Sequence, residues 1–164
     1  MNLYILRHAI AVERGTVRYP NDDRPLTPEG ISKMKKEAEC FPWLIKSIDM
    51  IFSSPLSRAK ETAHIAAKSL KAESKIHIID ALLPDAKIEN LFTELNSFWQ
   101  KENIMIVGHE PQLSLITSAL IGVDDSVVDL KKGGLCLVAV NGAMKKGSGK
   151  LQWLFRPKHL RALA

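Results

Sequence analysis

Short apolar runs alternate with amphipathic segments along this 164-residue chain. Each run is bounded by polar residues, glycine or proline, which is typical of short buried strands. The runs that predict strands are, in order, residues 3–6, 49–54, 76–79, 103–108, 135–140 and 151–155. Between the first four, apolar positions recur every three or four residues, as on helices packed by one face. Alternating strands and helices indicate a sheet covered on both faces.

The helix signals lie between these strands. Thr27 is expected to cap a helix whose first residue is Pro28, and Pro42 is expected to kink or end it. The apolar positions with helical spacing in this segment are Ile31, Met34, Ala38, Phe41 and Ile45. Further helices are predicted from Pro55, over residues 88–99, and from about 111 to 121. The whole pattern predicts one α/β domain over residues 1–164, a three-layer α/β/α sandwich with a mixed, mostly parallel sheet.

Composition narrows the choice of partners. The net charge is +5, which suits a basic surface, a nucleic-acid surface or a pocket for anions. Lysines are scattered and aromatic residues are only 6%, so nucleic-acid binding is disfavoured. No apolar run approaches the ~20 residues of a membrane span, and the start lacks a signal peptide, so a cytoplasmic location is expected. Cys40 and Cys136 lack metal-ligand spacing and are expected to be reduced core thiols.

Candidate chemistry lies just after three predicted strands. Arg7 and His8 follow the first strand, Arg58 follows Ser53-Ser54-Pro55, and His109 follows Val107-Gly108. The carboxyl ends of parallel strands meet at one sheet edge, so these side chains should share a cavity. Guanidinium groups bind phosphate oxygens bidentately, and a neutral imidazole can attack phosphorus. The set therefore predicts a site for phosphoryl transfer.

The motifs that contain these residues resemble a known family. They are R-H at 7–8, S-S-P-L-S-R-A-x-E-T at 53–62 and V-G-H-E-P at 107–111, in the order found in the histidine phosphatase superfamily. The short length and R-P-L-T-P-E-G at 24–30 are similar to SixA-type phosphohistidine phosphatases. The resemblance implies a phosphoglycerate mutase-like fold and a phosphatase without cofactor or metal. It also implies a phosphorylated histidine on a phosphotransfer protein as the substrate.

The resemblance also implies roles for single residues. His8 matches the nucleophile that becomes phosphohistidine. Arg7, Arg58 and His109 match the other members of the phosphate pocket. Arg24 is expected to be an additional contact to phosphate or substrate. Ala9 departs from the family, which usually has glycine there; we expect alanine to be tolerated, with an altered pocket as the alternative.

A second departure concerns the general acid. Larger relatives carry a glutamate or aspartate after the third strand, where this chain offers only Asp85 and Glu89. We interpret Asp85 as a helix N-cap and Glu89 as part of a solvated helix face, although either could be an acid. An alkoxide needs a proton to leave, whereas imidazole, with a conjugate-acid pKa near ~6.5, leaves readily. The missing acid favours a phosphohistidine substrate. The alternatives are a phosphatase for small phosphomonoesters, such as sugar phosphates, and a non-catalytic phosphate-binding module.

Overall fold

A six-stranded mixed sheet forms the centre of the computed structural model, which describes residues 1–164. The strand order is β3-β2-β4-β1-β5-β6. The first four strands pair in parallel, whereas β5 and β6 are antiparallel, which confirms the predicted mixed sheet. The strands are β1 (Asn2–Arg7), β2 (Met50–Ser53), β3 (Ile76–Ile78), β4 (Asn103–Gly108), β5 (Leu135–Val140) and β6 (Gly149–Phe155).

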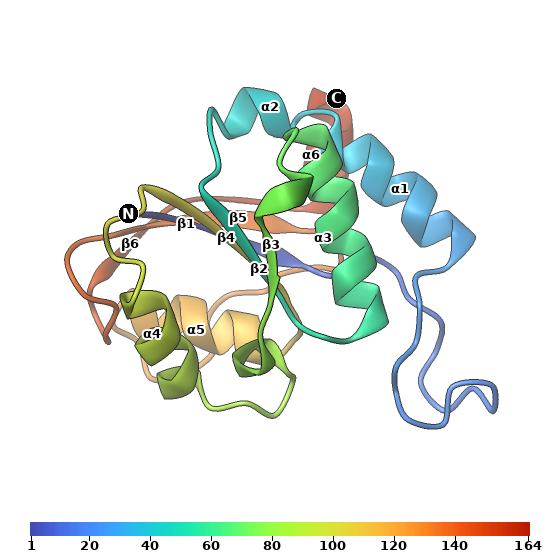
Figure 1. Cartoon of the computed structure of the whole chain (residues 1–164), viewed down its shortest axis with the longest axis horizontal. Coiled ribbons are helices and arrows are strands. Elements are labelled where there is room, and N and C mark those ends of the chain that lie inside the picture. Colours follow the sequence, from blue (N-terminus) through green and yellow to red (C-terminus); the bar gives the residue numbers. More distant parts are fainter.

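Helices cover both faces of the sheet, as Figure 1 shows. One face carries α1 (Pro28–Ala38), α2 (Phe41–Leu44), α3 (Ser57–Ser69) and α6 (Pro157–Leu163). The other face carries α4 (Ile88–Asn96) and α5 (Gln112–Leu120). Two single-turn 3₁₀ helices, η1 (Glu73–Lys75) and η2 (Asp80–Leu82), lie before and after β3. The α/β/α sandwich is confirmed, and none of the helices is both long and apolar enough to cross a bilayer.

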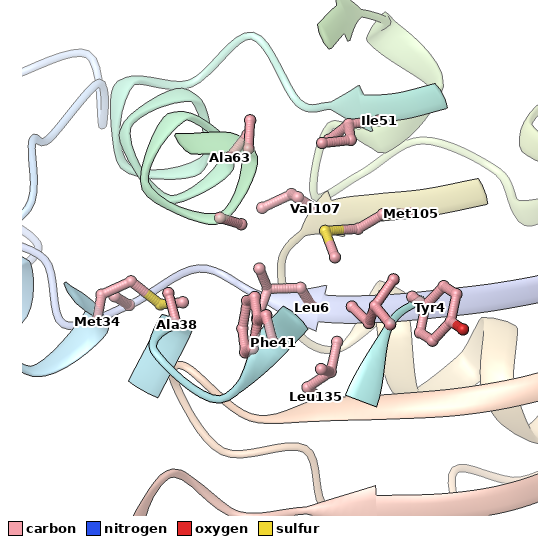
Figure 2. Packing of buried hydrophobic residues seen from close by; sticks show 14 of the residues in the cluster. Tyr4, Leu6, Met34, Ala38, Phe41, Ile51, Ala63, Met105, Val107 and Leu135 are labelled. Carbon is pink, nitrogen blue, oxygen red and sulfur yellow. The ribbon is translucent and has the colours of Figure 1, made fainter. Parts of the chain in front are cut away.

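The first strand lies between two hydrophobic cores. Its side chains alternate, so Leu3 and Ile5 join the core under α4 and α5, whereas Tyr4 and Leu6 join the opposite one. Figure 2 shows Tyr4 and Leu6 among side chains from β4, β5 and the helices α1, α2 and α3. Burial of such a side chain contributes about 1.5–3 kcal/mol to stability. Both faces therefore fix β1, and the residues after it leave the sheet at a defined place.

Two helices end earlier than the apolar spacing suggested. The first ends at Ala38, and Phe41 begins the separate turn α2. Pro42 has no N–H to donate to the carbonyl of residue 38, so the regular helix stops one turn before it. The helix predicted over residues 88–99 ends at Asn96, and Trp99 beyond it is 65% exposed.

No helix was predicted over the residues of α6. Its only buried residue is Leu160, so the helix leaves no apolar period in the sequence. Pro157 at its first turn is the one local signal that marks it. This helix packs beside α1, on the same face of the sheet as α2 and α3.

Candidate active site

The sheet places the ends of β1 and β4 side by side. Arg7 pairs with Gly108 in the parallel register, and the His8 amide donates to the Gly108 carbonyl at 3.0 Å. His8 and His109, the next residues of the two strands, are therefore neighbours, with ring centroids 5.0 Å apart. Their exposed fractions are only 6% and 2%. The structure brings the two predicted histidines together in one buried pair.

The tautomer of His8 follows from its hydrogen bond. Its Nδ1 lies 2.7 Å from the carbonyl oxygen of Ala9, which can only accept, so Nδ1 carries the proton. In the neutral ring Nε2 then has a free lone pair. Burial, the neighbouring His109 and the charges of Arg58 and Arg7 together lower the pKa of His8 to about 2. His8 is therefore a neutral imidazole with Nε2 available for attack.

A serine hydroxyl orients His109. Its Nε2 is 2.8 Å from Ser54 Oγ, which also accepts a hydrogen bond from the amide of Leu56. The hydroxyl can donate to Nε2, which leaves the proton of the neutral ring on Nδ1. That Nδ1 is buried without a protein partner. Burial, followed by the charge of Arg58, lowers the pKa of His109 to about 3, so this residue can donate a hydrogen bond while staying neutral.

Two guanidinium groups flank the histidines. Arg58, on the first turn of α3, is 2% exposed and donates to the carbonyl of Asp22 at 2.7 Å. Arg7 donates to the carbonyl of Leu130 at 2.9 Å. The Nε atoms of both arginines are buried without a protein acceptor. Such donors require partners, and an oxyanion would supply them.

Asp22 connects Arg58 with Arg24. Its carboxylate lies 3.3 Å from Arg58 and 2.7 Å from Nε of Arg24, which also donates to the carbonyl of Val12. Burial alone would raise the pKa of Asp22, but hydrogen bonds from Arg14 and Arg24 and the charge of Arg58 lower it. Arg24 thus reaches the edge of the pocket through a carboxylate that sequence analysis missed. A φ of 57° at Asp22 belongs to the left-handed region, which aspartate adopts more readily than most residues.

Thr62 connects α3 to the residue after the nucleophile. Its hydroxyl donates to the carbonyl of Arg58 at 2.6 Å and accepts from the amide of Ala9 at 3.0 Å. This fully buried side chain therefore positions the loop after His8. The neighbouring Glu61 accepts from the amide of Leu26 at 3.0 Å.

Three carboxyl groups besides Asp22 are candidates for a general acid. Asp85 is exposed and lines a hollow of about 430 Å³ together with Asp22. It is not the predicted N-cap, because Lys87 holds that position. Glu89 is solvated, as predicted, and lines a different cavity with Phe92. Glu110 follows His109, and burial raises its pKa, opposed by the charge of Arg7.

Ala9 fits its position. It is buried and is not among the non-glycine residues with positive φ, which are Asp22 and Lys71. An L-residue can therefore adopt this backbone without strain. The structure has no group of three or more histidine, cysteine, aspartate or glutamate side chains arranged to hold a metal ion.

Comparisons with known proteins relate this geometry to a family. The model of the histidine phosphatase superfamily, branch 1, matches residues 3–83. An uncharacterized protein of Picosynechococcus is 31% identical over 93% of this chain and 89% of its own length. The fold is similar to the protein histidine phosphatase SixA complexed with tungstate, with a TM-score of 0.84, 20% identity and coverage of 98% and 99% of the two chains. It is also similar to the α-ribazole phosphatase of Shigella flexneri, with a TM-score of 0.75, 19% identity and coverage of 96% and 97%.

Proposed function

The chain belongs to the histidine phosphatase superfamily, and we propose that it is a phosphatase for a phosphorylated histidine on a phosphotransfer protein. The observation that carries this proposal is the pairing of a neutral nucleophile with an ionised nearby carboxylate. Burial lowers the pKa of His8 and keeps this residue unprotonated. The arginines that contact Asp22 lower the pKa of that carboxyl group. Asp22 therefore has no proton to give to a leaving group at neutral pH. A substrate whose leaving group needs none fits best.

Phosphohistidine is such a substrate. When its second ring nitrogen carries a proton, the imidazole leaves as a neutral molecule as soon as the P–N bond breaks. A serine or sugar leaves as an alkoxide, which must be protonated in the same step. General acid catalysis contributes about 10²–10⁴-fold to such reactions, so a site without the acid should discriminate by that order.

The proposed reaction has two in-line steps. Nε2 of His8 attacks phosphorus, the N–P bond forms, and the P–N bond to the substrate imidazole breaks. Water then attacks the phosphorus of His8-phosphate, and its proton leaves with orthophosphate. The ring of His8 is released neutral, with its proton still on Nδ1 beside the carbonyl of Ala9. No step is assigned to a metal, and we expect activity to survive treatment with a chelator.

The other polar groups would stabilise charge on the transferring phosphoryl group. Arg7 and Arg58 would bind its equatorial oxygens through their fixed guanidinium donors. His109 would donate from Nδ1, because Ser54 holds its Nε2. Arg24 would contact phosphate or substrate at the edge, where it now binds Asp22.

A rate comparison tests the substrate class. A phosphohistidine protein, phosphoserine, sugar phosphates and α-ribazole phosphate would be compared by kcat/KM. We expect the phosphohistidine protein to exceed the phosphomonoesters by at least about 10²-fold. Equal or higher rates on a phosphomonoester would contradict the proposal.

The second candidate is a phosphatase for small phosphomonoesters. It is favoured by Asp85, which lines the hollow beside Asp22, and by Glu110, whose pKa is raised by burial. If this candidate is correct, Asp85→Asn or Glu110→Gln should lower kcat on phosphomonoesters about 10²-fold. Inactivity on every phosphoramidate and phosphomonoester would instead revive a non-catalytic phosphate-binding role.

A further inference from the structure

A basic cleft lies beside the phosphate pocket, on the sheet face that α1 and α6 cover. Its volume is about 370 Å³, and its wall combines residues from α1, α6 and the loop before β5. One carboxylate, Glu37, lines it, is buried, and forms an ion pair with Arg161. The cationic lining residues are Arg7, Lys33, Lys131, Lys132 and Arg161. Positive charge is therefore in large excess in this cleft.

The charges on its rim are available to a ligand. Lys33 and Lys131 form pairs with Glu29 and Asp129 at 2.5 and 2.8 Å, but these partners are more than half exposed. Such surface pairs are worth about 0–1 kcal/mol and are readily replaced. Lys132 is exposed and forms no ion pair with a carboxylate, unlike its neighbour Lys131. The cleft can thus offer at least one ammonium group without breaking a pair.

The cleft is fixed next to the nucleophile. It shares Arg7 and Ala9, which flank His8, with the end of β1. Gly133, next to Lys132, donates its amide to the carbonyls of Arg7 and His8 at 3.1 and 3.2 Å. A side chain on Gly133 would collide with Glu37, because a Cβ there would lie 2.4 Å from its carboxylate. Close packing therefore fixes the backbone of the loop that carries Lys131 and Lys132 relative to His8.

We propose that this basic cleft binds acidic side chains that flank the phosphohistidine on a protein substrate. The inference rests on the proposed function and adds the chemistry by which the partner is recognised. An extended chain advances about 3.3 Å per residue. The residues next to a bound phosphohistidine would therefore lie over the protein surface close to His8. The cations come from β1, α1, α6 and the loop before β5, which suits several carboxylates better than one small anion. The separate hollow that contains Asp22 and Asp85 has no lysine or arginine in its wall, so acidic residues would favour the basic side.

Two short phosphohistidine peptides test this surface. They differ only in that the residues flanking the phosphohistidine are glutamates in one and glutamines in the other. We expect kcat/KM of the wild-type protein to be about tenfold higher for the glutamate peptide, through KM rather than kcat. In Lys132→Glu this preference should fall about tenfold, while the rate on the glutamine peptide stays the same.

A matched control separates the cleft from net charge. Lys101→Glu makes the same charge change at an exposed residue before β4 that does not line the cleft, and it should keep the preference. An equal loss of preference in both variants, or no preference in the wild type, would overturn the docking proposal. So would a fall on both peptides in Lys132→Glu. A wild-type protein that hydrolyses neither peptide but hydrolyses a phosphomonoester would overturn the proposed function, and the docking proposal with it.

Discussion

The two halves of the candidate pocket are built in different ways. The strand-end half consists of Arg7, His8 and His109, which lie at the ends of adjacent buried strands and are set by the register of the sheet. The loop half consists of Asp22 and Arg24, which lie in the irregular segment 11–26 and reach the pocket through ion pairs. The two imidazoles of the first half are buried and neutral. The second half is partly solvated and fully charged. We infer that the strand-end half performs the chemistry and the loop half adjusts anion affinity.

The largest expected effect comes from breaking the strand-end half. His8→Ala removes the only atom assigned to attack phosphorus, so kcat/KM should fall by at least about 10³-fold. Acid-labile covalent labelling by ³²P should disappear with it. His64→Ala is the control, because His64 is exposed on α3 and bonds only to the carbonyl of Lys60. Full labelling of His8→Ala would remove His8 from the nucleophile role.

The two halves also differ in how far the sequence could predict them. Buried runs and the cation or imidazole after them marked the strand-end half, because sheet edges collect strand ends. In the loop half, Arg24 was expected only from the resemblance, and Asp22 could not be predicted, since the segment around it has no period and its contact with Arg58 joins residues far apart in the sequence. The same limit applied to α6, where one buried residue gives no pattern. The ion pair of Glu37 with Arg161 joins residues far apart in sequence, which spacing cannot reveal.

Acid should weaken the strand-end half first. His8 has a pKa of about 2 in the folded protein and ~6.5 when unfolded, so the unfolded state binds more protons between these values. Its contribution to stability is complete above pH ~6.5 and is lost by about 1.4 kcal/mol per pH unit as pH falls below it. Asp22, whose folded pKa is also lowered, contributes stability that is lost only in the more acidic range below its ordinary pKa of ~3.9.

Denaturant unfolding from pH 6.5 to 5 measures this difference. We expect the free energy of unfolding to depend less steeply on pH in His8→Asn than in the wild type. The two slopes should differ by about 1.4 kcal/mol per pH unit. Glu37, whose pKa burial raises to about 7, acts in the opposite direction, but it is present in both proteins and cancels. Parallel slopes for the two proteins would show that His8 is not held neutral.

A smaller effect is expected from the loop half. Asp22→Asn removes the charge beside Arg58 but keeps the backbone carbonyl that Arg58 binds at 2.7 Å. Orthophosphate should then inhibit the enzyme about 3- to 10-fold more strongly, because Arg58 and Arg24 no longer share a carboxylate. Asp124→Asn is the matched control, since Asp124 pairs with Lys146 at another cavity. Weaker inhibition in Asp22→Asn would mean that Asp22 orients Arg58 instead of competing for it.

The smallest effect is expected at Ala9, the residue directly after His8. Glycine there would keep both backbone hydrogen bonds: the carbonyl would still accept from Nδ1 of His8, and the amide would still donate to the hydroxyl of Thr62. We therefore expect kcat/KM to stay close to that of the wild type. It would also make the unfolded chain more flexible, which costs about 0.4–1 kcal/mol of stability. Thermal unfolding should therefore occur a few degrees lower in Ala9→Gly. A large rise in activity would instead show that the methyl group alters the pocket, because the backbone of Ala9 requires no positive φ.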